Sequence, residues 1–428
     1  MEATAQTDER DFSVVVFGAS GIAGRNVAAY LARRAGETGV RWAVAGRDPA
    51  KLERTLGEIG VTAPQTLVAD VANPASLAAM ASRTRVVLDL VGPYTLYGRP
   101  VIEACVANGA HYADLTGEIP FVRRTIDAFH ERAATAGLKI VQVGGFEALP
   151  ADLAVLLASE TARQRWDEEL AEADVQVTTR QPRGRLGLSD LVSGGSLQSM
   201  AEMTGAEGAE LIADPAALIE DAALAAAVRQ VSPISLAPRS NAQGGAIAPM
   251  TPSPFINPAV VHRTMALTAA TRGAAPSPFR YREGMVAPGG AATLPLRYAA
   301  AGALSATQAG LRALTQARPS IRERAAKGMR RALPASGFGP AGERLEDWSW
   351  QLSVDARTAG GHYLRVDLDA DGHPGYLTTS WMLGEAGLLL AEDGATPAAG
   401  GCLTPAAALG TAHLDRFEGA GMRFAVSS

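Results

Sequence analysis

Three glycines near the N-terminus have the spacing of a loop that binds phosphate. Gly18, Gly21 and Gly24 follow a run of valine and phenylalanine, and a helix-forming stretch begins after Gly21. The first glycine permits a tight turn, the second lets a pyrophosphate approach the backbone, and the third lets the helix pack closely on the strand. The N–H groups at the start of that helix would then point at an anion. The spacing is GxxGxxG rather than GxGxxG, so an ordinary strand–turn–helix is the alternative interpretation.

The end of the second predicted strand indicates which dinucleotide would bind. An acidic residue at this position accepts hydrogen bonds from the ribose of NAD, whereas an arginine accommodates the 2′-phosphate of NADP. Here the strand ends at Gly46 and Arg47, and a guanidinium can bind phosphate in a bidentate manner. Asp48 precedes Pro49 and reads as a helix N-cap. The sequence therefore predicts NADPH/NADP as the cofactor, the alternative being that Arg47 is a solvated surface residue.

Further contacts with the cofactor are expected in the turns that follow the other predicted strands. Ligands of open α/β sheets bind at the carboxyl ends of the strands. An acidic residue that ends the third strand is expected near the adenine, and the turn after the fourth strand is expected over the nicotinamide half. The predicted contacts outside the three glycines and Arg47 are Ser20, Ile22, Arg25, Asp70, Gly92 and Pro93.

A bound nicotinamide donates a hydride, so the protein needs no nucleophile but must orient the substrate and supply a proton. The phenols of Tyr94 and Tyr112 are within reach of the ends of predicted strands and are the preferred proton donors, with Asp114 and Glu147 ranked below them. Packing in the core is the alternative role of each tyrosine. The histidines show no HxxxH or triad-like pattern, and no GxSxG elbow occurs.

Strands and helices that alternate over the first 150 residues must position these side chains. Apolar runs near 14–17, 41–46, 65–70, 85–91, 111–114 and 139–143 read as strands, with helices expected at 49–58, 74–81 and 100–108. This alternation is typical of an α/β fold with a Rossmann doubly wound parallel sheet.

The pattern changes after residue 150. Two runs with period-two alternation, at 348–356 and 362–369, predict a hairpin, and 231–258 reads as long irregular structure. We expect an α+β substrate domain with a mostly antiparallel sheet. The predicted organisation is a disordered tail at 1–11, a Rossmann NADP-binding domain at 12–150, the α+β domain at 151–380, and C-terminal helices at 381–428 that return to the Rossmann domain.

Composition excludes several classes of protein. The formal net charge of −5 over 428 residues offers no electrostatic basis for nucleic-acid binding. Cys105 and Cys402 lie in no CxxC spacing, so free thiols are expected rather than a metal site or a disulfide framework. The acidic N-terminus is no signal peptide, and the uncharged window 240–262 is interrupted by prolines, so a cytoplasmic protein is expected.

One segment carries a strong positive charge. A helix is expected from Tyr298 to Arg331 with a break at Pro319, and residues 312–331 contain seven Arg or Lys and one Glu. Such a face could dock an acidic carrier protein or lie on the anionic inner surface of the plasma membrane. A solvated helical face is the alternative, and a homodimer is left open.

Several longer blocks resemble the saccharopine-dehydrogenase-like oxidoreductases, in particular the branch of actinobacterial trans-acting enoyl reductases of lipid and polyketide synthesis. The resemblance covers nearly the whole chain. Its blocks are Gly18–Arg25, Ala45–Arg47, Val91–Tyr94, Tyr97–Cys105, His111–Glu118, Pro374–Gly387 and Gly400–Gly410.

The resemblance implies an NADPH-dependent enoyl reductase acting on an α,β-unsaturated acyl or polyketide-type chain, which an acyl carrier protein could hold. It also implies substrate contacts at Gly195, Ser196 and Asn257. For Gly195 and Ser196, a loop that only starts a helix is the alternative. Where the family has an Asp-Ser pair, this chain has Glu147 and Ala148, and Glu147 is therefore expected to alter the substrate pocket.

Two other functions stay open at this point. A saccharopine-type reductase of imines or amino acids would need arginine clamps for carboxylates, which Arg180, Arg183 and Arg185 could supply. A non-catalytic, lipid-associated NADPH-binding protein is the second alternative, because the family's Asp-Ser pair is missing.

Overall fold

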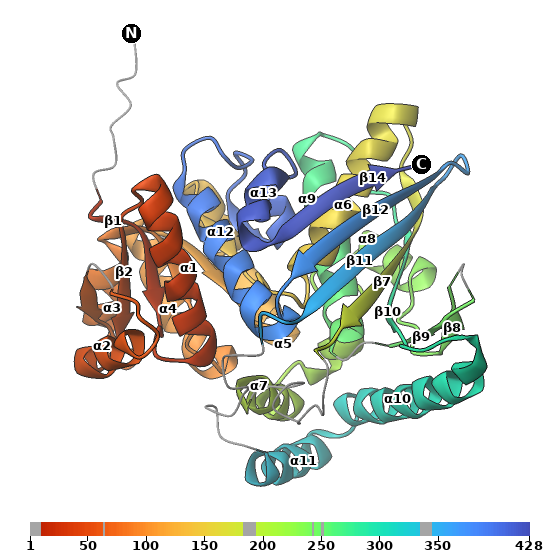
Figure 1. Cartoon of the computed structure of the whole chain (residues 1–428), viewed down its shortest axis with the longest axis horizontal. Helices are drawn as coiled ribbons and strands as arrows, with labels where there is room; N and C mark the ends of the chain where they lie inside the picture. The colour runs from red at the N-terminus through yellow and green to blue at the C-terminus, as the bar shows by residue number, and fades with distance from the viewer. Residues whose placement is uncertain (1–9, 63–64, 183–193, 242–243, 250–251, 334–344) are drawn as a thin grey trace.

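The structure is a computed structural model that describes residues 10–62, 65–182, 194–241, 244–249, 252–333 and 345–428 (Figure 1). The prediction for residues 1–11 therefore falls almost entirely outside the described residues, as do Arg183 and Arg185.

Six strands from the first part of the chain and one from its C-terminal segment form a parallel sheet in the order β13-β6-β5-β4-β1-β2-β3. Val15 of β1 pairs with Ala43 of β2 on one side and with Val87 of β4 on the other. The strand order reverses between β1 and β4, which is where dinucleotides bind in sheets of this topology. The strands are β1 Phe12–Phe17, β2 Trp42–Gly46, β3 Thr66–Val68, β4 Thr84–Asp89, β5 His111–Asp114, β6 Lys139–Val141 and β13 Gly401–Leu403.

Helices cover both faces of this sheet, which explains why β1 is apolar without interruption from Val14 to Phe17. Val14 and Val16 pack in one core cluster with α1 and α12, whereas Val15 and Phe17 pack in a second cluster with α3, α4 and α5. The predicted doubly wound sheet is thus confirmed. The helices are α1 Ile22–Thr38, α2 Pro49–Gly57, α3 Pro74–Ala81, α4 Tyr94–Asn108, α5 Ile119–Thr135, α6 Leu149–Trp166 and α12 Thr379–Ala391.

A second sheet of seven strands has the order β14-β12-β11-β7-β10-β9-β8. Only β10 and β7 run parallel, and the other neighbours are antiparallel, so the predicted mostly antiparallel sheet is confirmed. The expected hairpin is β11 and β12, in which Val354 pairs with Val366. The strands are β7 Leu170–Arg180, β8 Arg239–Ser240, β9 Ala246–Ala248, β10 Arg280–Val286, β11 Ser349–Thr358, β12 Tyr363–Asp371 and β14 Met422–Ser427.

The C-terminal segment differs from its prediction. Helices alone were expected over 381–428, but β13 adds to the first sheet and β14 to the second. The segment after β13 is divided into α13 Pro405–Leu409 and a 3-10 turn at Leu414–Ala420, because Gly410 adopts a φ of 66° that ends α13. Helix α12 contacts α1 and β4 of the first sheet.

The remaining helices lie on the side of the second sheet and along the outer edge of the molecule. α10 and α11 form an elongated pair at the periphery, interrupted before Pro319, and α7 lies between α11 and the body of the protein (Figure 1). These helices are α7 Gly194–Gly205, α8 Ala222–Val231, α9 Asn257–Thr271, α10 Leu294–Thr315 and α11 Pro319–Ala332. Within the described ranges, no helix is both long and apolar enough to cross a membrane.

A buried carboxylate joins α1 to α12, and we expect its loss to be strongly destabilising. Glu385 is fully buried and accepts hydrogen bonds from Tyr30 Oη at 2.5 Å, Arg34 Nε at 3.1 Å and Arg416 Nε at 2.8 Å. Removing it leaves two guanidinium groups without their buried counter-ion, so Glu385→Ala should lower the free energy of unfolding by about 3–5 kcal/mol. Urea denaturation measures this change. Glu37→Ala, which removes the exposed partner of Arg34, is the control and should cost less than about 1 kcal/mol. If the two variants lower the free energy of unfolding equally, Glu385 is not the buried counter-ion that we assign.

Candidate functional site

The three glycines of the first turn have different neighbours. Gly18 has a φ of 89°, and a Cβ there would lie 2.8 Å from Val91 Cγ2. A Cβ on Gly24 would lie 2.3 Å from the carbonyl oxygen of Gly18. By contrast, the only described atom within 4 Å of a Cβ on Gly21 is Gly18 O, at 3.6 Å. The protein itself therefore fills the space around the first and third glycines, whereas the space beside Gly21 is left for a ligand.

The N-terminus of α1 faces the same open space. Gly21 is the N-cap, no side chain caps the helix, and its first turn contains no acidic residue. The first N–H groups of a helix have no partner within the helix and carry the positive end of its dipole. Arg25 lies in this turn and is partly exposed. The turn thus has the geometry and the sign of charge to hold a pyrophosphate.

Arg47 stands at the carboxyl end of β2 as an exposed side chain, and no described residue forms a hydrogen bond or ion pair with it. Asp48 does not pair with it, because Asp48 caps α2 by accepting a hydrogen bond from Lys51 N at 3.0 Å, as the sequence predicted. Asp70, at the end of β3, is partly buried and accepts a hydrogen bond from Ala72 N at 2.9 Å. A free guanidinium therefore lies at the position that a 2′-phosphate requires in this fold.

The turn after β4 is held by Asp89 and Tyr94. Asp89 Oδ1 accepts a hydrogen bond from Val91 N at 3.0 Å, and Tyr94 Oη donates to Asp89 O at 3.1 Å. The Gly92–Pro93 peptide bond between them is cis. Helix α4 begins at Tyr94 rather than at residue 100, so Pro100 lies inside the helix and the prediction of its start was wrong. The turn that carries Gly92 and Pro93 is thus shorter than the sequence suggested.

Glu118, which the sequence analysis did not single out, explains where α4 begins. Its carboxylate is fully buried and accepts hydrogen bonds from Tyr94 N at 3.0 Å and from Thr95 N at 2.7 Å. These are the first two N–H groups of α4. The positive end of α4 is therefore already occupied by a carboxylate, which leaves the N-terminus of α1 to bind the phosphates.

A phenol and two carboxyl groups form a buried cluster behind this turn. Tyr112 Oη lies 2.8 Å from Asp114 Oδ2 and 3.2 Å from Asp89 Oδ2, and all three residues are fully buried. Burial raises the pKa of Asp89 well above its usual value and the pKa of Asp114 to about 7. The pair therefore retains a proton near neutral pH, since two adjacent buried carboxyl groups do not both ionise readily.

The preferred proton donors do not have the exposure that direct donation requires. Tyr112 is 0% exposed and Tyr94 is 7% exposed, and the Tyr94 hydroxyl also accepts a hydrogen bond from Leu115 N at 3.3 Å. Burial, followed by the nearby carboxylates, raises the pKa of both phenols well above the usual value. Both hydroxyl groups are enclosed and engaged in the framework of the site, and proton donation by Tyr94 or Tyr112 stays a prediction.

The predicted substrate residues are not brought together. Glu147 lies in the turn between β6 and α6 and is partly exposed. Gly195 and Ser196 lie in the first turn of α7, which contacts α4. Asn257 is 1% exposed, and its Nδ2 donates to Glu283 Oε2 at 2.8 Å; its role as a substrate contact stays a prediction.

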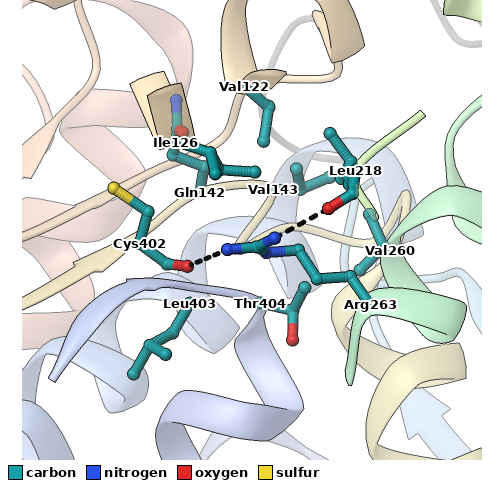
Figure 2. Close-up of a pocket in the computed structure, with 10 residues that line it drawn as sticks. All are labelled: Val122, Ile126, Gln142, Val143, Leu218, Val260, Arg263, Cys402, Leu403 and Thr404. Carbon is teal, nitrogen blue, oxygen red and sulfur yellow. Dashed lines mark hydrogen bonds between the residues drawn. The ribbon is translucent and has the colours of Figure 1, made fainter. Parts of the chain in front are cut away.

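A small cavity lies where α9, β13 and α5 meet, and its size excludes it as a substrate pocket (Figure 2). Its volume is about 10 Å³, which is room for a single water molecule. The guanidinium of Arg263 lies across it and donates to Leu218 O at 2.7 Å and to Cys402 O at 3.0 Å. Arg263 therefore joins three segments of the chain and has a structural role.

Asp152, near this cavity, should make stability depend on pH. It is fully buried, accepts hydrogen bonds from Thr264 Oγ1 at 2.5 Å and Ala406 N at 2.8 Å, and burial raises its pKa to about 7. An unfolded aspartate loses its proton near pH 4. Between about pH 4 and 7 the unfolded chain thus binds fewer protons than the folded one, and the free energy of unfolding falls as pH rises.

In Asp152→Asn the free energy of unfolding should therefore fall less steeply as pH rises. Urea denaturation at several pH values measures this slope. Asp114 and Glu283, whose pKa values are also raised to about 7 by burial, act in the same direction, so part of the slope should remain. The exposed Asp369→Asn is the control. An Asp152→Asn slope equal to that of the unaltered chain would refute the prediction.

Comparison with known proteins places the site in a family. Residues 14–141, which include the glycine turn, Arg47 and the turn after β4, match the family model of the saccharopine dehydrogenase NADP binding domain. The chain is 35% identical over 428 residues to a protein of Mycobacterium tuberculosis (strain ATCC 25618 / H37Rv) named as a trans-acting enoyl reductase, with 96% of this chain and 97% of that protein covered. It is 33% identical over 438 residues to the trans-acting enoyl reductase of Mycobacterium ulcerans (strain Agy99), with 97% of each covered.

Among solved structures, the chain is similar to apo histidine-tagged saccharopine dehydrogenase (L-Glu forming) from Saccharomyces cerevisiae. The sequence identity is 14% and the TM-score 0.49, with 97% of this chain and 100% of that chain covered.

Proposed function

This chain belongs to the saccharopine dehydrogenase-like family of trans-acting enoyl reductases, and we propose that it reduces the α,β-unsaturated bond of an acyl or polyketide-type thioester with NADPH. The observation that carries the proposal is the open space at Gly21 beside an uncapped helix N-terminus, within a chain that resembles enoyl reductases over nearly its whole length. That arrangement fits the phosphates of the cofactor without any change in the protein.

The residues of the chain have separate tasks in this proposal. The turn at Gly21 and the N-terminus of α1 hold the pyrophosphate, and Arg47 holds the 2′-phosphate. The turn at Gly92 and Pro93, fixed by Asp89 and Glu118, supports the nicotinamide half. The cofactor, when bound, supplies a hydride for the β-carbon of the substrate.

Substrate panels distinguish this function from its alternatives. We expect NADPH oxidation, followed by its absorbance, with a trans-2-enoyl thioester and none with α-ketoglutarate plus lysine. The reverse result would support saccharopine-type chemistry, and tight NADPH binding without turnover of any substrate would support a non-catalytic protein. Of the arginines considered for carboxylate clamps, Arg180 is exposed at the end of β7.

The outer face of α11 supports a further part of the proposal, namely an acidic carrier protein as the partner that presents the substrate. Arg318, Arg324, Lys327 and Arg331 are exposed and have no hydrogen-bond or ion-pair partner in the described part of the chain. The opposite face of α11 packs on α7, which in turn contacts α4. The basic face therefore lies close to the elements of the site (Figure 1).

The double variant Arg324→Glu with Lys327→Glu reverses two of these charges. It should raise the KM for a carrier-bound enoyl substrate at least about tenfold, and this KM should depend less on salt concentration. The KM for a small enoyl thioester should not change, because that substrate needs no docking. Arg41→Glu, an exposed charge on the first sheet, is the control. An unchanged KM for the carrier-bound substrate would contradict the docking site, and loss of binding to anionic vesicles instead would assign this face to lipid.

A further inference from the structure

The turn between β6 and α6 places the carboxyl group of Glu147 at the carboxyl edge of the first sheet. A Cβ added to Gly145 would lie 2.9 Å from Glu147 Oε2, 3.1 Å from Leu115 Cδ2 and 3.3 Å from Thr379 Cγ2. The carboxyl group is thus folded back over Gly145, between the end of β5 and the start of α12. In this topology, the half of the sheet formed by β4, β5 and β6 holds the nicotinamide end of the dinucleotide.

Contacts from the second sheet fix this turn. Phe146 N donates to Thr379 Oγ1 at 3.0 Å, and the Phe146 ring meets the ring of Trp350 edge-on, with centroids 4.9 Å apart. Trp350 belongs to β11, and its Nε1 donates to Thr378 Oγ1 at 3.3 Å. Glu147 therefore lies at the boundary between the two sheets. A substrate held by the second sheet would meet a cofactor held by the first sheet at this boundary.

Glu147 differs from the other acids near this edge because its carboxyl group is not committed to a partner. The carboxyl groups of Asp89, Asp114 and Glu118 are fully buried and hold the framework through hydrogen bonds. Glu147 is partly exposed, and the hydrogen bond found for its carboxyl group within the described residues comes from its own main-chain N–H.

Burial raises the pKa of Glu147, and no charged neighbour contributes to this shift. Tyr94 and Asp114, two other titratable groups at this edge of the sheet, are engaged with Asp89 and Tyr112. An acid with a raised pKa is suited to proton donation near neutral pH.

We infer that Glu147 is the acid that protonates the α-carbon of the enoyl thioester, an inference that rests on the proposed function. The hydride forms the new C–H bond at the β-carbon, and the electron pair of the C=C bond moves toward the α-carbon and the thioester carbonyl. Glu147 gives its proton to the α-carbon, and the carboxylate regains a proton from water at its exposed side. The net change is one hydride and one proton added to the double bond.

Glu147→Gln tests this inference, with a trans-2-enoyl thioester as the substrate. We expect kcat to fall about 10²- to 10⁴-fold, because a positioned acid is lost, while the Kd for NADPH changes less than about twofold. In D₂O the unaltered enzyme should place deuterium on one face of the α-carbon, whereas Glu147→Gln should give both diastereomers, since bulk water replaces the positioned acid. Glu147→Asp should restore part of the activity, and Glu103→Gln, an exposed residue of α4, is the control.

The outcomes test the role of Glu147 and the proposed function separately. A kcat for Glu147→Gln within threefold of the unaltered value, with deuterium still on one face, would overturn the role of Glu147 and leave the proposed function intact. Absence of enoyl reduction in the unaltered chain would instead overturn the proposed function. If Glu147→Gln does not fold, Gly145→Ala takes its place, because its Cβ displaces the carboxyl group without removing it. A folded Gly145→Ala variant with unchanged kcat and stereochemistry would then overturn the inference.

Discussion

Gly21→Ala is expected to weaken NADPH binding about 100-fold while leaving the thermal unfolding temperature unchanged. The added methyl group meets no protein atom closer than Gly18 O at 3.6 Å, so the fold can accept it. It fills the space that the pyrophosphate needs in order to approach the N-terminus of α1. Losing one or two charge-assisted hydrogen bonds, each contributing about 1.5–3 kcal/mol, accounts for an effect of this size.

Two other glycines provide matched comparisons for this variant. Gly24→Ala should impair both binding and stability, because its Cβ would lie 2.3 Å from the carbonyl oxygen of Gly18. Gly36→Ala, in the same helix with no atom within 4 Å of its Cβ, should bind NADPH normally and be more stable by about 0.5–1 kcal/mol. Fluorescence titration with NADPH and thermal unfolding measure both properties. Normal NADPH affinity in Gly21→Ala would contradict the placement of the pyrophosphate.

Arg47→Ala is expected to reduce the preference for NADPH over NADH by about 10- to 100-fold. The guanidinium is exposed and has no partner within the described residues, so its charge is available to a 2′-phosphate. Removing a charge-assisted hydrogen-bond pair costs about 1.5–3 kcal/mol. NADH lacks that phosphate, and its affinity should not change.

A neighbouring arginine serves as the control for this second prediction. Arg54 is exposed on α2 and carries the same charge, but it lies more than one helical turn beyond the end of β2. Arg54→Ala should therefore keep the selectivity of the unaltered chain. If Arg47→Ala binds NADPH and NADH with the same affinities as the unaltered chain, the assignment of Arg47 to the cofactor site is wrong.

Local signals allowed much of the first sheet to be predicted. Helix α3 begins and ends where the sequence suggested, because Asn73 accepts a hydrogen bond from Ser76 N and Pro74 occupies the first helical position. The same N-cap and proline signal identified α2. The roles of the three glycines could be predicted because each is a backbone requirement within a single turn.

Features that depend on distant parts of the chain could not be predicted in this way. The start of α4 is capped by Glu118, which lies 24 residues beyond Tyr94, so nothing near residue 94 indicated it. β13 contains three residues and pairs with β6 across more than 250 positions of the sequence. Tyr94 and Tyr112 lie within reach of predicted strand ends, but their burial in the core formed with α4 and α5 depends on packing that a sequence pattern does not report.

The central claim is that this chain transfers a hydride from NADPH to the β-carbon of an enoyl thioester. The most direct measurement uses NADPH deuterated at C4 on the transferring face, a trans-2-enoyl thioester, and mass spectrometry of the product. We expect one deuterium, located on the β-carbon of a saturated thioester. A product without deuterium, or transfer of deuterium to the carbon of an imine while the enoyl thioester stays unchanged, would contradict this reaction.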